Sequence, residues 1–499
     1  MLLTTEISYR ERVLGCWLGK CLGGALGMPF EGVPETVDIK REDLKILDVP
    51  NDDLELQLVW IAALKEHGLE LNEEIMAEIW LRDIKFACDE YSIALRNLKN
   101  GILPPASGYV ENFFADGMGA VIRSEIWALL FYDRPDAAAY FTALDASVDH
   151  WGDGVWAAIF MVVAECLAFQ GKSIPEIIFE ALQEIPENTR SRKALSFVLQ
   201  CYTDKVPQDK AFRLVRERFN HHNFTDAVMN CAYGVFALLY GEEDFIETIL
   251  LALRFGRDTD CTAASCGAFL GILKGVDCIP EAWQKKVNKR LALSDFVEVI
   301  ELAPKTMNEL IKVTMELREK FAAEISALSF PAYIPYVAES PTEKPDQWLI
   351  LDENEHNIEE IREILLASGK CPEELNRFVL PTEKLLLDLS PFADGTNTLN
   401  LFTFLHCENC PDEAVISATA DTGMTLWFDD KRILNCHNRQ KMIPSFHRAE
   451  GGAAFLYDFK DKQKKLVQVK LYSCRAPLRF ALIFGDLNNQ YIDEFKLKI

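Results

Sequence analysis

Residues 256–264 have the sequence Gly-Arg-Asp-Thr-Asp-Cys-Thr-Ala-Ala and lead into small and apolar residues up to Gly275. This pattern predicts a buried helix that begins near Asp260. One acid at a helix N-terminus is ordinary capping, because it is stabilised by unpaired N–H groups and the helix dipole. Two acids, Asp258 and Asp260, beside an apolar helix need another explanation, since buried charge is costly unless it is paired.

A second acidic cluster, Asn51-Asp52-Asp53, opens another predicted apolar helix that continues to Leu64. Carboxylates that converge are stabilised by a hard divalent cation such as Mg²⁺ or Mn²⁺. We therefore interpret the two clusters as halves of one metal site. For either cluster taken alone, plain helix capping remains open as an alternative.

The first predicted helix ends in the glycine-rich stretch 19–31, Gly-Lys-Cys-Leu-Gly-Gly-Ala-Leu-Gly-Met-Pro-Phe-Glu. Glycines at such spacing let helix backbones approach closely, which is a packing role. Glu31 follows Pro29 at the exit of this helix, where it can face a cleft.

Composition predicts a folded, soluble protein of more than one domain. The chain has 499 residues, 49% of them hydrophobic and 26% charged. The net charge of −25 argues against nucleic acid or a membrane surface as a general partner. Residues 370–499 hold 17 basic and 17 acidic side chains, so the acidic excess lies before them. This change in composition indicates a domain boundary near residue 370.

The cysteines and the N-terminus favour a cytoplasmic protein over a secreted one. The 14 cysteines are scattered through apolar contexts, as is typical of reduced, buried thiols. Residues 13–28 are apolar enough to suggest a signal peptide, but Glu11 and Lys20 interrupt that pattern. No apolar run reaches the ~18 residues of a membrane span.

Periodicity predicts a multidomain chain, in which a large all-α domain precedes a β-sandwich. Helical patterns dominate residues 1–327 and include long ones at 73–98 and 280–292. Residues 328–372 are rich in proline and polar residues, which predicts a linker with one short helix. Residues 373–499 contain short β-rich runs separated by Gly, Asn and Asp, which favours a jelly-roll-like sandwich.

Two further segments carry candidate binding residues. Asp116-Gly117-Met118-Gly119-Ala120 precedes a predicted helix, and such a loop can offer N–H groups to a phosphate. A simple tight turn is the alternative. His150 follows Asp149 and is either a ligand-contacting residue or a structural histidine at a helix end.

Taken in this order, these motifs resemble the ADP-ribosylglycohydrolase family over roughly residues 8–290. The resemblance implies an all-α domain with two Mg²⁺ or Mn²⁺ ions. It also implies hydrolysis of the glycosidic bond between ADP-ribose and a protein side chain or small-molecule acceptor. By position, it implies metal ligands at Asp52, Asp53, Asp258 and Asp260, a ribose contact from Glu31, and ribose or phosphate contacts from Gly117, Met118, Gly119, Ala120 and His150.

Three positions depart from the family pattern. Asn51 stands where the family usually has Thr, and its amide oxygen can still be a metal ligand. Cys261 also replaces Thr, and because a thiol is a poor ligand for Mg²⁺, the second ion is expected to bind more weakly or to be displaced. Gly24 replaces an Asp, which removes a polar anchor.

The residue types suit hydrolysis at the ribose C1 carbon, which passes through an oxocarbenium-like state that carboxylates stabilise. Glu31, Asp53 and Asp258 are the candidate catalytic residues, with Glu31 preferred as acid or base. Two alternatives stay open. One is a hydrolase of another nucleoside or glycoside, and the other is a non-catalytic protein that binds ADP-ribose and whose β-domain holds a glycan or protein.

Overall fold

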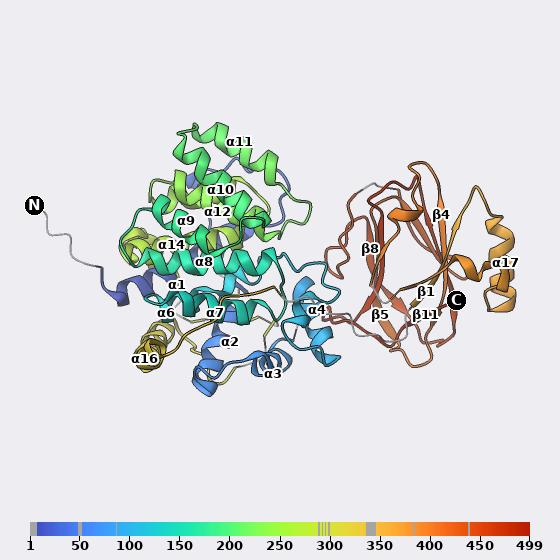
Figure 1. Ribbon diagram of the computed structural model, residues 1–499, viewed down its shortest axis with the longest axis horizontal. Helices are drawn as coiled ribbons and strands as arrows, with labels where there is room; N and C mark the ends of the chain where they lie inside the picture. The colour runs from blue at the N-terminus through green and yellow to red at the C-terminus, as the bar shows by residue number, and fades with distance from the viewer. Residues whose placement is uncertain are drawn as a thin grey trace, which may run out of the picture. The chain divides into compact units, whose positions relative to one another are not determined.

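The chain folds into two compact units (Figure 1). The computed structural model describes residues 7–47, 52–85, 87–287, 290–291, 293–294, 296–297, 300–335, 346–382, 385–437 and 440–499. The helical unit comprises Met1–Lys85 and Asn97–Val337, and the β unit comprises Phe86–Arg96 and Ala338–Ile499. The second unit thus begins within the predicted linker 328–372, and it also takes in residues 86–96 from the predicted 1–327 range.

Helices account for nearly all regular structure before residue 330. In chain order they are α1 (Tyr9–Gly27), η1 (Met28–Phe30), η2 (Arg41–Asp43), α2 (Asp52–His67), α3 (Glu73–Asp83), α4 (Asp89–Lys99), α5 (Ala106–Tyr109), η3 (Val121–Arg123), α6 (Glu125–Phe131), α7 (Pro135–Ala146), α8 (Asp153–Ala168), α9 (Ile174–Ala181), η4 (Leu182–Glu184), α10 (Arg190–Thr203), α11 (Gln208–Phe219), α12 (Ala227–Tyr240), α13 (Phe245–Arg254), α14 (Thr259–Lys274), η5 (Val276–Cys278), α15 (Glu281–Gln284) and α16 (Met307–Ala327). The predicted all-α domain is confirmed.

A glycine seam joins α1 to α14 along their whole length. Gly15, Gly19 and Gly23 face the backbones of Gly271, Gly267 and Ala263, so the two helices run antiparallel in steps of four residues. A Cβ atom built on Gly19 would lie 2.1 Å from the carbonyl oxygen of Gly267. The spacing that predicted close helix packing is therefore confirmed, and the seam leads directly to the start of α14.

Two predicted helices are shorter than their sequence pattern because tertiary pairing overrides it. The pattern at 73–98 breaks after α3, where Ile84 forms a β-bridge with Val297 and the Lys85 N–H donates to the Phe296 carbonyl. The pattern at 280–292 ends with α15. Beyond it, Arg290 pairs with Thr306 in extended conformation.

Helix α1 with η1, Tyr9–Phe30, is long and apolar enough to cross a membrane by length and composition alone. The expectation that no segment reaches this length is therefore wrong. Of its 18-residue apolar window, 67% is buried, much of it against α14. Such burial is typical of the core helix of a soluble domain.

The β unit contains two antiparallel sheets and a covering helix. Its elements are β1 (Asp346–Asp352), α17 (Ile358–Ser368), η6 (Glu373–Phe378), β2 (Val379–Thr382), β3 (Leu386–Asp388), η7 (Ser390–Phe392), β4 (Leu399–His406), β5 (Glu413–Ala420), β6 (Met424–Phe428), β7 (Lys431–Cys436), β8 (Gly452–Asp458), β9 (Lys465–Leu471), β10 (Arg479–Gly485) and β11 (Lys496–Lys498). Among the described residues, the first sheet has the order β2-β1-β4-β9-β6-β7, with β11 also on β4, and the second has the order β3-β10-β5-β8.

The two sheets share one apolar core, to which Leu401 and Val469 contribute from the first sheet and Ile416 and Leu482 from the second. This is the predicted sandwich. Strand β1 lies within the predicted linker 328–372, and it is buried on both faces because α17 covers the outer face of the first sheet. A strand buried on both faces lacks the alternation that reveals a strand in a sequence.

Part of the β unit comes from far upstream in the chain. The Ala87 N–H donates to the Asn488 carbonyl, and the Arg96 guanidinium pairs with Asp493 at 2.7 Å. Asp89 is buried against Arg448.

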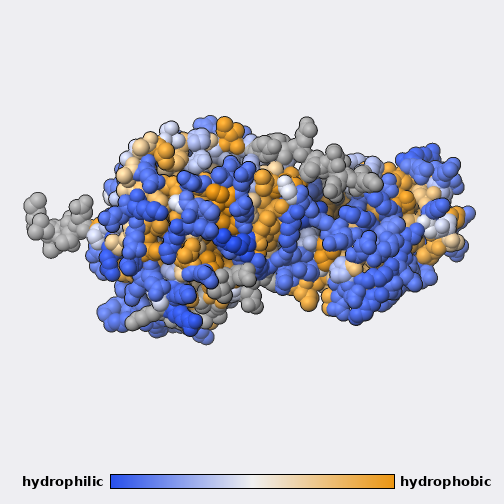
Figure 2. Space-filling model, turned by 90° about the horizontal axis from the view of Figure 1, so that it is seen from below, coloured by the Kyte–Doolittle hydropathy of each residue, from blue (hydrophilic) through white to orange (hydrophobic). Residues whose placement is uncertain are grey.

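In the view of Figure 2, hydrophilic residues on both units are interspersed with smaller apolar areas rather than separated from them.

Candidate functional site

Glu31 is held beside the start of α14 by short backbone pairings. Just after η1, the Gly32 N–H donates to the Arg257 carbonyl, and the Arg257 N–H donates to the Val33 carbonyl, both at 2.8 Å. Gly32 has a φ of +75°, a conformation that favours glycine, and this lets the chain turn directly after Glu31. The exposed Glu31 side chain therefore lies next to the second acidic cluster.

The second acidic cluster begins α14 at the end of the glycine seam. Asp258 is the N-cap residue, and Asp260 is the second residue of the helix. The Thr259 hydroxyl donates to the Gly27 carbonyl at 2.9 Å, which fixes the first turn of α14 to the last turn of α1. Asp258 and Asp260 are only 2% and 4% exposed, so both carboxylates lie inside the protein.

The acidic side chains from both ends of the helical unit converge. The ligand atoms of Glu31, Asp258 and Asp260 lie within 4.8 Å of one another, and so do those of Asp53, Asp260 and Cys261. Asp260 belongs to both groups. Asp53 lies in the first turn of α2 and is 2% exposed. Side chains more than 200 residues apart in the sequence therefore form one cluster.

Burial and mutual repulsion disfavour negative charge on the carboxylates of this cluster. Burial raises the pKa of Asp258 well above its ordinary value, and the neighbouring carboxylates of Asp260 and Glu31 raise it further, against the lowering effect of a hydrogen bond with Cys261. The Asp258 Oδ2 atom is buried and has no hydrogen-bond partner among the described residues. Converging carboxylates with a buried, unsatisfied oxygen fit a divalent cation.

The other two predicted ligands are placed less fully. Asp52 is the first residue of α2, directly before Asp53. Asn51 lies outside the described residues. Metal ligation by Asn51 and Asp52 stays a prediction.

Similarity to known proteins is found over the part of the chain that carries these acidic residues. A sequence model of the ADP-ribosylglycohydrolase family matches residues 5–313. The chain belongs to the ADP-ribosylglycohydrolase family. The match covers the segments that carry Glu31, Asp53, Asp258 and Asp260, and it ends before residue 338, where the C-terminal part of the β unit begins.

Two relatives of this family member are similar over most of their own length. An uncharacterised protein of Archaeoglobus fulgidus is 27% identical over 298 residues, covering 57% of this chain and 94% of the relative. The ADP-ribosylhydrolase ARH3 of Danio rerio is 24% identical over 318 residues, covering 55% of this chain and 85% of the relative. A solved structure of an ADP-ribosylglycohydrolase-related protein complex has 19% identity and a TM-score of 0.42, and covers 62% of this chain and 98% of that one.

The 117–120 loop does not form the open N-terminus of a long helix in this family member. Gly117, Met118, Gly119 and Ala120 are buried, and they lead into the three-residue η3. The Met118 carbonyl accepts from the Val121 and Ile122 N–H groups, so part of the loop satisfies itself. Its predicted contact with ribose or phosphate stays a prediction.

His150 sits in a buried ionic network. It is 1% exposed, and its Nδ1 atom lies 2.8 Å from Asp149 Oδ1. The Arg123 guanidinium donates to both oxygens of Asp149 and to Asp145. Burial raises the pKa of Asp149, but Arg123 and His150 outweigh it and leave that pKa below its ordinary value. The structural role weighed for His150 is thus present, and a substrate contact stays a prediction.

A second buried network supports the acidic cluster, and none of the sequence motifs predicts it. The Lys20 ammonium on α1 pairs with Glu125 on α6 at 2.7 Å, and both are 1% exposed. The Gln57 amide, one turn after Asp53 on α2, donates to Glu125 and to the Asp53 carbonyl. The network ties together α1, α2 and α6, which position the first half of the site. Its sequence signal is Lys20 within the apolar part of α1 and Glu125 at the start of the otherwise apolar α6.

Glu165 on α8 is buried and interacts electrostatically with Glu125 and Lys20 of this network. It makes the stability of the protein depend on pH. Burial raises its pKa well above the ordinary 4.5, and nearby Glu125 adds to this. Above pH 4.5 the folded state therefore keeps a proton on Glu165 that the unfolded state has lost. The contribution of the protonated Glu165 to the free energy of unfolding is complete below pH 4.5 and falls as the pH rises. Glu165→Gln mimics the protonated form. The free energy of unfolding of this variant minus that of wild type is expected to increase by about 1.4 kcal/mol per pH unit above 4.5, until the raised pKa of Glu165 is reached.

Chemical denaturation of both proteins between pH 4.5 and 8 measures this difference. Parallel stability curves over the whole range would show that Glu165 does not carry a raised pKa.

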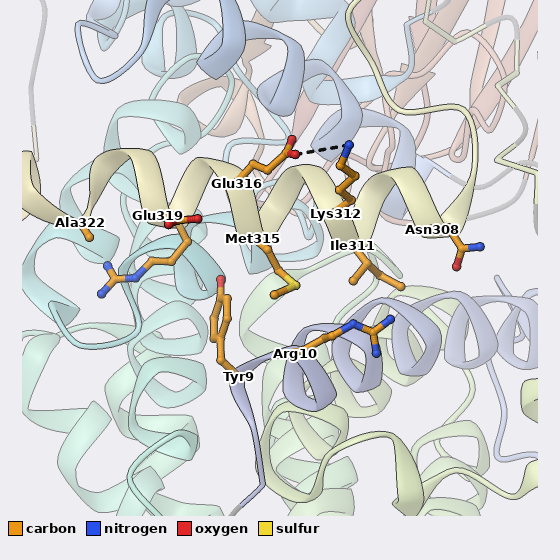
Figure 3. A pocket seen from close by; sticks show the side chains of 10 residues that line it. Tyr9, Arg10, Asn308, Ile311, Lys312, Met315, Glu316, Glu319 and Ala322 are labelled. Carbon is orange, nitrogen blue, oxygen red and sulfur yellow. Dashed lines mark ion pairs between the residues drawn. The ribbon is translucent and has the colours of Figure 1, made fainter.

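A pocket of about 720 Å³ lies elsewhere on the helical unit (Figure 3). Tyr9 and Arg10 from the first turn of α1 face Ile311, Met315 and Glu319 on α16. Because α1 has 19 residues, about 28 Å separate this pocket from the Glu31 end of the helix. The pocket is therefore distinct from the acidic cluster.

Proposed function

We propose that this protein is a metal-dependent hydrolase that cleaves the glycosidic bond of ADP-ribosyl conjugates. Membership of the ADP-ribosylglycohydrolase family supports a glycosidic hydrolase. The observation that carries the proposal is a pair of adjoining groups of candidate ligands, Glu31 with Asp258 and Asp260, and Asp53 with Asp260 and Cys261, which share Asp260. Mg²⁺ or Mn²⁺ suits the carboxylate oxygens best.

In this proposal Asp53, Asp258 and Asp260, together with Asn51 and Asp52, hold the cations. When bound, a divalent cation supplies Lewis-acid polarisation of the substrate oxygens and a water of lowered pKa. The buried carboxylates stabilise the positive charge that develops on the ribose as the bond to C1 breaks.

Glu31 is the exposed member of the cluster and can exchange protons with solvent. We assign it the role of general base or acid at the reacting water or leaving group. The 117–120 loop and His150 are proposed to contact the ribose and phosphates.

A panel of conjugates tests this function. The full chain is incubated with ADP-ribose linked to arginine, serine, phosphate or acetyl groups, and released ADP-ribose is measured with Mg²⁺, with Mn²⁺ and after chelation. We expect release from at least one conjugate, its loss on chelation, and its recovery when metal is restored.

Failure on the whole panel with metal bound would favour a different nucleoside or glycoside substrate. Tight binding of ADP-ribose without bound metal and without turnover would favour the non-catalytic alternative.

A further inference from the structure

The two groups of candidate ligands differ in chemistry. Glu31, Asp258 and Asp260 offer carboxylate oxygens alone, whereas Asp53 and Asp260 are joined by the thiol of Cys261. Hard oxygen sets suit Mg²⁺ and Mn²⁺, but a sulfur ligand favours a softer ion, and Zn²⁺ accepts both Cys sulfur and carboxylate oxygen as ligands.

Cys261 is built into the cluster rather than lying beside it by chance. It is the third residue of α14 and only 8% exposed, and its Sγ atom lies within 4.8 Å of ligand atoms of both Asp53 and Asp260. Ligand atoms of a tetrahedral zinc site lie roughly 3.5 Å apart, which small side-chain adjustments can reach from this arrangement. Asp258 Oδ2, in the adjoining group that shares Asp260, is buried and lacks a hydrogen-bond partner among the described residues, which independently indicates that this cluster binds cations.

We infer that Asp53, Asp260 and Cys261 form a mixed oxygen–sulfur position that takes Zn²⁺ or a similarly soft divalent ion in preference to Mg²⁺. The all-oxygen position of Glu31, Asp258 and Asp260 keeps the hard ion, and Asp260 is shared between the two. This inference rests on the proposed metal-dependent function and specifies the ion class of one half of that site.

Cobalt provides a direct test, because Co²⁺ substitutes for Zn²⁺ and absorbs in the near ultraviolet when a thiolate binds it. Metal-free full-length protein is titrated with Co²⁺. Wild type is expected to develop this band to saturation at one Co²⁺ per chain, and Cys261→Ser is expected to lack it. Cys266→Ser is the matched control, since Cys266 lies on the same helix and its thiol faces the Gly234 carbonyl instead.

Calorimetry gives a second readout. The ratio of Zn²⁺ to Mg²⁺ affinity is expected to fall at least tenfold in Cys261→Ser, with circular dichroism showing that the fold is kept. In wild type, Zn²⁺ but not Mg²⁺ should protect Cys261 from alkylation, which requires no variant.

Identical cobalt spectra for wild type and Cys261→Ser would overturn the inference. Hydrolysis with Mg²⁺ and no thiolate band would reject this inference alone and leave the proposed function standing. A thiolate band without hydrolysis of any conjugate would do the reverse. Wild type that binds no divalent ion would reject both.

Discussion

Asp260→Asn is expected to abolish hydrolysis while the helical unit stays folded. Asp260 is the only residue common to both groups of candidate ligands among the described residues, so its loss weakens both cation positions at once. We expect kcat/KM to fall on the order of 10³-fold or more, as when one member of a catalytic unit is removed. Steady-state kinetics and calorimetric titration with Mn²⁺ measure the two losses.

Stability separates this effect from misfolding. Asp260 repels the buried Asp258, so replacing it with a neutral side chain should leave the melting temperature of the metal-free protein unchanged or higher. Asp244→Asn is the matched control, because Asp244 is an exposed N-cap of α13 and Asn caps equally well. Activity within tenfold of wild type in Asp260→Asn would remove Asp260 from the site.

Gly19→Ala is expected to destabilise the protein by about 3 kcal/mol or more, the upper end of what overpacking costs. The added methyl group would lie 2.1 Å from the Gly267 carbonyl oxygen, and backbone on both sides cannot move aside as a flexible side chain can. The helices would have to separate along the seam that sets the position of Glu31 against Asp258. Chemical denaturation measures the loss, and metal affinity should fall with it.

Gly234→Ala supplies the contrast. Gly234 on α12 faces the same helix α14, but its added methyl group would meet Cys266 and Thr262 side chains at 3.5 and 3.6 Å, which is ordinary contact. An alanine inside a helix is favoured over glycine, so this variant should be neutral or more stable by about 0.5–1 kcal/mol. Equal destabilisation of both variants would show that the seam has no special role.

Much of the helical unit is predictable from the sequence, because its helices are long, periodic and bounded by capping residues or proline. The acidic clusters were also visible, since two acids at the start of an apolar helix contradict simple burial. The sequence does not predict how close the acidic clusters lie to each other in space. The seam, with Gly27 packed on the first turn of α14, and the backbone pairings of Gly32 and Val33 with Arg257 bring Glu31 and Asp258 together.

The misses have physical causes. The network of Lys20, Gln57 and Glu125 is not predictable from the sequence, because a buried pair is recognisable only when both partners are known. Strand β1 was assigned to the linker because covering helix α17 gives it a continuous apolar face on each side. The break between α3 and α4 depends on pairing with residues 296–297, more than 200 positions away.

The excursion of residues 86–96 into the β unit has a practical consequence for anyone who wishes to study the two units separately. Trimming the chain near residue 337 would not yield a clean fragment on either side of the cut. The downstream piece would lack the partners of Asn488, Arg448 and Asp493, and the upstream piece would carry Asp89 and Arg96 stripped of theirs. The chain has to be cut on both sides of residues 86–96 before either unit is self-contained.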